Sequence, residues 1–187
     1  MKKIALVLMA IALISASAFA GDMAKSGQWG IQTSLGVGTS PQSVGSIGVK
    51  FMASENLAIR VKAGFVSFTP PVASGGSSSS TSGYEVGAGF EYHMESKGGS
   101  VSPYVGLQFG YGGESLPTPS GGGTVNNAST WAVNGVFGGE YFFSSNFSWG
   151  GEIGIGYANV STGATGVDAG HAFGTTSATS IVTWYLN

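Results

Sequence analysis

The chain has 187 residues, a formal net charge of −2 and no cysteine. Charged residues make up 9% of it, against about 25% in an ordinary soluble domain, while 33 residues are glycine and 12% are aromatic. The acidic balance excludes the basic surface that nucleic-acid binding requires, and the lack of cysteine excludes disulfides and thiolate metal sites.

Residues 1–20 have the pattern of a cleaved signal peptide. Lys2 and Lys3 precede an apolar run over 4–14, which is shorter than the ~20 residues that a spanning helix needs. The stretch Ala18–Ala20 then supplies the small residues that a signal peptidase recognises. We therefore predict an exported protein, with an uncleaved membrane anchor as the alternative.

The mature chain, 21–187, is long enough for one domain. Loss of the leader leaves five Lys and Arg against nine Asp and Glu, a formal charge of −4. From Trp29 onward, apolar residues alternate with polar or small ones, as in a strand with one face buried. In chain order, this period of two predicts strands over 28–38, 46–53, 57–65, 84–94, 105–111, 131–143, 147–157 and 179–186.

Most of these segments are about ten residues long, which matches a tilted membrane-spanning strand of 9–11 residues. A helix would carry a cost of ~1 kcal/mol for each interior glycine. The sequence therefore predicts an all-β fold, an eight-stranded antiparallel transmembrane up-and-down β-barrel. The alternatives are a soluble β-sandwich and a glycine-rich fibre.

The connections between the predicted strands alternate in length. Short turns fall at 54–56 and 144–146, with an intermediate one at 95–102, and the long links are 69–83, 113–129 and 160–172. In bacterial barrels, short turns face the periplasm and long loops face outside. We expect a protein of the outer membrane of a Gram-negative-type bacterium, with both termini periplasmic.

Aromatic residues on the apolar face gather near strand ends, as expected for the two interfaces of a bilayer. The girdle predicted at the periplasmic side comprises Trp29, Phe51, Tyr92, Tyr141, Phe143, Phe147, Trp149 and Trp184. The girdle predicted at the outer side comprises Phe65, Tyr84, Phe109, Tyr111, Trp131 and Tyr157. A soluble sandwich would keep its aromatic residues inside and its charges outside.

Every charge within a predicted strand falls on the opposite, lumen-facing side. These residues are Lys50, Arg60, Lys62, Glu85, Glu91, Glu140 and Glu152. The lumen of an eight-stranded barrel is only wide enough for side chains, so charges of opposite sign are expected to pair there. We predict an ion-pair plug, and the alternative is a narrow polar pore lined by the same groups.

Three stretches of the chain, 103–111, 138–143 and 149–153, resemble the small outer-membrane β-barrel family. That family includes OmpA/OmpX-type and opacity-protein-like eight-stranded barrels. The resemblance covers essentially the whole mature chain, through a periodic pattern. It implies membrane anchoring, adhesion or a structural role, and it carries no catalytic residues to transfer.

Signs of chemistry are sparse. The two histidines are His93, expected in the lumen, and His171, which lies three residues after Asp168 in the last long link. No serine stands near either in a pattern that predicts a nucleophile and its base, and one His–Asp pair falls short of a metal site. We expect no catalytic residues, metal or cofactor.

The sequence thus predicts a non-enzymatic outer-membrane barrel with a structural or surface-interaction role. A porin-like diffusion pore is the alternative, and an outer-membrane lipid-modifying enzyme is a more distant one. The expected partners are outer-membrane lipids and a surface ligand or host or cell-surface partner that meets the three long links. We expect a monomer.

Overall fold

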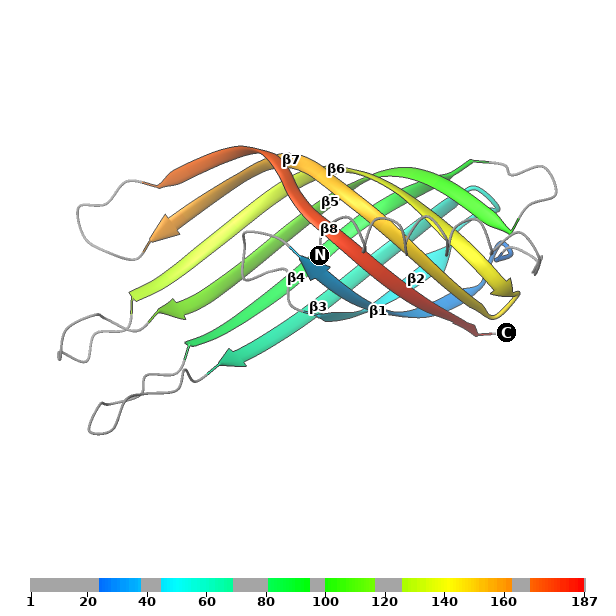
Figure 1. Ribbon diagram of the computed structural model, residues 1–187, viewed down its shortest axis with the longest axis horizontal. Helices are drawn as coiled ribbons and strands as arrows, with labels where there is room; N and C mark the ends of the chain where they lie inside the picture. The colour runs from blue at the N-terminus through cyan, green and yellow to red at the C-terminus, as the bar shows by residue number, and fades with distance from the viewer. Residues whose placement is uncertain are drawn as a thin grey trace, which may run out of the picture.

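The computed structural model describes residues 24–37, 45–68, 81–94, 100–116, 126–162 and 169–186. The predicted signal peptide lies outside these ranges. Eight strands form a closed barrel in which each strand pairs antiparallel with the next and the last pairs with the first (Figure 1). They are β1 (Trp29–Val37), β2 (Ser46–Met52), β3 (Leu57–Phe68), β4 (Thr81–His93), β5 (Val101–Leu116), β6 (Asn126–Ser144), β7 (Phe147–Thr162) and β8 (Gly170–Leu186).

The barrel confirms the predicted fold class and the alternation of faces. On β3, Phe65 points out of the barrel and is 72% exposed, whereas Arg60 points into the lumen and is 4% exposed. Large apolar side chains on the other strands are likewise exposed on the outer surface. Such a surface suits a lipid environment, because every backbone group of a closed barrel finds a partner within the sheet. Within the described residues, no helix is long and apolar enough to cross a membrane.

The strands of the second half are much longer than predicted. β5, β6, β7 and β8 have 16, 19, 16 and 17 residues, so two of the predicted long links shrink to 117–125 and 163–169. The third, between β3 and β4, spans 69–80. The extra residues are rich in Gly, Ser, Thr and Asn, which indicate loops by local preference. Cross-strand pairing overrides that preference, as where Glu114 pairs with Gly83 on one side and Ala128 on the other.

A β-bulge interrupts β8. Gly154 of β7 pairs with Ser177, but the next residue, Ile155, pairs with Thr175, so Thr176 is the extra residue. A bulge shifts the alternation of faces by one position. Beyond it, Thr183 and Tyr185 are buried in the lumen as predicted.

The barrel has two different ends (Figure 1). At the loop end, links 69–80, 117–125 and 163–169 join the strands, whereas the turn end carries the short turns and the start of β1 and end of β8. Just inside the turn end, an apolar layer fills the lumen. It consists of Ala24, Met52, Ala58, Phe142 and Tyr185, and the rings of Phe142 and Tyr185 stack with centroids 5.8 Å apart.

The predicted girdle residues lie on the outer surface, with two departures from expectation. Ring contacts run along the turn end, for example between Trp29 and Phe51 at 4.6 Å. Tyr141 is only 8% exposed, since it packs edge-on against Phe143. Phe109 lies midway along β5, next to Ala88 and Val133, so the long strand removes it from the loop end.

Candidate functional site

The lumen contains a chain of five buried charges that alternate in sign. Lys50 Nζ lies 2.8 Å from a carboxylate oxygen of Glu140 and 2.8 Å from one of Glu91. Arg60 continues the chain, with Nη1 2.8 Å from Glu91 and Nη2 2.7 Å from Glu152. The order of this ion-pair chain across five strands is Glu140, Lys50, Glu91, Arg60 and Glu152. The side chain of Glu91, shared by both cations, is 1% exposed.

Hydroxyl groups hold both ends of the ion-pair chain. Tyr185 donates a hydrogen bond to Glu140 at 2.8 Å, and Ser148 donates to the same carboxylate. At the other end, Tyr104 donates to Glu152 at 3.0 Å. Buried carboxylates need such donors, because unmade hydrogen bonds are costly away from water. Tyr104 is buried, and the strand-five alternation, extended back by one residue, would have placed it in the lumen.

The ring of Tyr104 occupies space that only a glycine leaves free. A Cβ at Gly138 would overlap the Tyr104 ring and approach the Gly151 carbonyl oxygen to 2.8 Å. The absence of a side chain at this position therefore allows Tyr104 to reach Glu152.

Gly138→Ala is expected to lower the free energy of unfolding by about 1–3 kcal/mol, as overpacking of a buried site does. Urea unfolding of the purified protein measures the change. Gly135→Ala is the matched control on the same strand, because a Cβ there meets nothing nearer than 3.7 Å. Equal effects of the two changes would contradict the contact.

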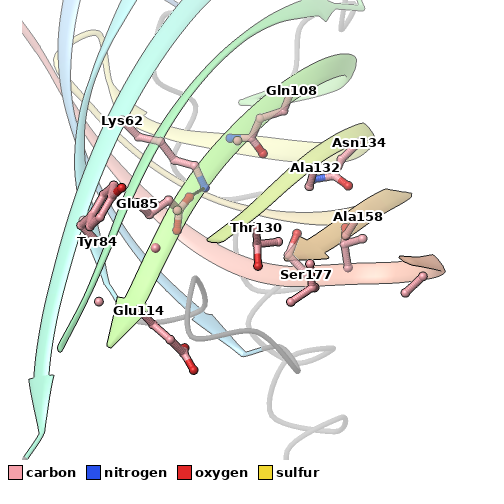
Figure 2. Close-up of a pocket in the computed structure, with 18 of the residues that line it drawn as sticks. Lys62, Tyr84, Glu85, Gln108, Glu114, Thr130, Ala132, Asn134, Ala158 and Ser177 are labelled. Atoms are coloured by element: carbon pink, nitrogen blue, oxygen red, sulfur yellow. Dashed lines mark ion pairs between the residues drawn. The ribbon is translucent and has the colours of Figure 1, made fainter. Parts of the chain in front are cut away.

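The remaining two predicted residues form a separate pair. Lys62 Nζ lies 2.5 Å from Glu85, and the Lys62 side chain is 26% exposed. This pair borders a cavity of about 390 Å³ on the loop side of the ion-pair chain (Figure 2). The structure thus divides the seven predicted charges into a buried chain of five and a pair that lines a cavity.

His93 has partners that the sequence did not reveal. Its Nδ1 lies 2.8 Å from Ser102 Oγ, and its Nε2 lies 3.1 Å from Glu91. The sequence pattern did not indicate this serine: antiparallel pairing of β4 with β5 places Tyr104 opposite His93 and brings Ser102, two residues away on the same face, alongside.

These contacts are those of a nucleophile, base and carboxylate, but the site gives a substrate no access. Ser102 is 2% exposed and His93 4%, and neither borders a cavity found in the described part of the chain. Glu91 also serves the ion-pair chain. We interpret the triplet as interior packing.

The surroundings of the second histidine, His171, do not form a metal site among the described residues. The ring of His171 stacks on Tyr157 with centroids 6.2 Å apart, and Asp168 lies outside the described residues. Within the described ranges, no three His, Asp or Glu side chains are grouped as metal ligands would be.

Comparison with known proteins places the fold. No protein-family model matches the chain, and no curated protein matches its sequence. Among solved structures, the chain is similar to the N-terminal β-barrel domain of Pseudomonas aeruginosa OprF, with a TM-score of 0.56, 12% identity and coverage of 86% of this chain and 98% of that one. It is also similar to the outer membrane protein AlkL in lipid bilayers, with a TM-score of 0.54, 13% identity and coverage of 90% and 94%. The chain has the fold of the small outer-membrane β-barrels.

Proposed function

We propose that this chain is a non-enzymatic integral protein of the bacterial outer membrane whose lumen is closed to through passage. The observation that carries the proposal is the ion-pair chain, five buried charges linked across the barrel from β6 to β7 through β2, β3 and β4. The apolar layer around Phe142 and Tyr185 lies beside it at the turn end. Two successive layers of side chains therefore fill the lumen.

The exposed apolar surface and the fold support a place in the outer membrane. The short turns and barrel termini are proposed to face the periplasm, as in bacterial barrels generally. The loop end would then face outside, and its links 69–80, 117–125 and 163–169 would be available to a surface ligand or another cell. The proposed role is thus structural or one of surface interaction.

A diffusion pore is the competing function. It would need a continuous water path, but the cavity of about 390 Å³ lies on the loop side of the ion-pair chain, and a smaller cavity lies beside the chain. The smaller one, about 20 Å³ next to Arg60 and Glu152, has room for about one water molecule. No observation favours the pore over the closed barrel.

Conductance measurements test the closed lumen. We expect the folded protein in a planar lipid bilayer to show no steady ionic current, because the ion-pair chain and the apolar layer occupy the lumen. Its insertion is checked in the same preparation by the different gel migration of unboiled and boiled samples. A reproducible unitary current that shifts in ion selectivity on Lys62→Ala would contradict the proposal.

A further inference from the structure

The cavity on the loop side of the lumen is formed by small side chains of several strands. It is lined mostly by small inward residues, among them Gly110, Thr130, Ala132, Ala158 and Ala172. A Cβ at Gly110 would meet nothing within 4 Å, so the wall there borders open space. Its volume of about 390 Å³ is within the range of small-molecule sites. We call it the loop-side cavity.

Two primary amides, those of Gln108 and Asn134, line the inner end of this cavity. Gln108 and Asn134 are direct cross-strand neighbours, 5% and 9% exposed. Among the described residues, the buried Asn134 Oδ1 atom has no hydrogen-bond partner. Buried polar groups almost always have a partner, and here both residues line the cavity (Figure 2).

The charges around the cavity are unbalanced. Lys62 is paired with Glu85, but Glu114, which also lines the cavity, has no ion-pair partner among the described residues. The described lumen as a whole contains three cations, Lys50, Arg60 and Lys62, against five carboxylates. A negative charge within low-dielectric walls attracts cations and excludes anions.

We propose that the loop-side cavity binds a small organic cation that also carries an uncharged hydrogen-bonding group. The uncharged group bonds to Gln108 and Asn134 at the inner end, and the ammonium group lies toward Glu85 and Glu114. Gly112, the residue opposite Glu85, is four residues from Gln108 on β5, about 14 Å along a strand. The ligand is therefore elongated, and the alanine and valine side chains of the wall contact its apolar middle.

The site rests on the proposed function only because the ion-pair chain closes its inner end. Binding is measured without reference to conductance, so either idea can fail alone. The probe is 6-aminohexanamide, which joins an ammonium group to a primary amide through an apolar chain. Hexanamide lacks the charge, hexylamine lacks the amide, and 5-carbamoylpentanoate replaces the cation with an anion.

Calorimetric titration of the full barrel in lipid nanodiscs is the measurement. We expect saturable one-to-one binding of 6-aminohexanamide, about tenfold weaker binding when either group is missing, since one hydrogen bond or ion pair is worth up to about that factor, and no binding of the anion. Gln108→Leu should reduce the affinity for 6-aminohexanamide to that for hexylamine. Glu114→Gln should reduce it toward that for hexanamide.

Two glycine variants locate the site. Gly110→Phe should fill the cavity and abolish binding, whereas Gly135→Phe, on the outer surface where a Cβ meets nothing nearer than 3.7 Å, should leave binding unchanged. Both variants are checked for folding by gel migration. Absence of saturable binding in the wild type, equal binding of the anion, or full binding by a folded Gly110→Phe variant would overturn the proposal.

Discussion

Replacing Arg60 with alanine is expected to lower the free energy of unfolding by about 3–5 kcal/mol, the cost of breaking a buried ion pair by removing one partner. Glu91 keeps Lys50 as a partner, but among the described residues Glu152 retains only the hydroxyl of Tyr104. The loss should appear as a lower urea midpoint for the protein folded in detergent micelles or vesicles.

A second substitution, added to Arg60→Ala, identifies which carboxylate is left unpaired. Glu152→Gln added to Arg60→Ala should recover part of the loss, because the charge without a partner is removed. Glu85→Gln added to Arg60→Ala should recover nothing, since Glu85 is bound to Lys62. Equal recovery by both second changes would contradict the pairing, as would Arg60→Ala with wild-type stability.

Lys62→Ala provides the matched control for the effect of burial. It also removes a cation from an ion pair, but its side chain is 26% exposed beside the loop-side cavity. Ion pairs that face water contribute about 0–1 kcal/mol. We therefore expect the loss from Lys62→Ala to be several-fold smaller than that from Arg60→Ala.

A lysine on the outer surface is expected to have the other large effect. Val61→Lys should lower the free energy of unfolding in lipid vesicles by about 2–4 kcal/mol, the cost of a lysine or arginine facing lipid at mid-depth. Val61 is 56% exposed and lies halfway along β3 between the outward residues Leu57 and Phe65. The yield of protein that folds in vesicles should fall as well.

The same substitution near the turn end serves as the control. Val101 is also an outward valine, 39% exposed, but it is the first residue of β5. A lysine there reaches the interface, where the cost falls to about 0–1 kcal/mol. Equal destabilisation by Val61→Lys and Val101→Lys would contradict the placement of Val61 at mid-depth on the lipid-facing side of β3.

The faces of the strands were predictable because a strand alternates with a period of exactly two residues once its start is known. Lys50 and Arg60 could be placed in the lumen from that alternation alone. Their partners could not, since pairing depends on the stagger of the strands around the barrel and on side-chain reach. The central place of Glu91, which contacts both cations, is a property of the closed barrel.

Two further features depended on the register between strands. Ser102 and His93 are in separate parts of the sequence pattern, and the β4–β5 hairpin makes them neighbours. The position of the ion-pair chain along the barrel also depends on this register. In the structure the ion-pair chain occupies the turn-end half, so Gly110 in the other half borders open space.

The distribution of the ion-pair chain along the sequence has a consequence for assembly. All the cations of the described lumen are on β2 and β3, and β5–β8 contain no Lys or Arg. Glu140 is 90 residues from Lys50, with which it pairs. A nascent sheet of β1–β4 would have an excess of positive charge, and one of β5–β8 would have only negative charges on its inner face.

Neither half can therefore neutralise its inner face alone, and leaving such charges unpaired in a membrane is costly. The two halves attract one another, and the last pairs form only when both are present and the sheet curves shut. Ring closure and neutralisation thus become a single event. We therefore expect a half-formed sheet to be unstable in the bilayer, because charges on its inner face lack their partners.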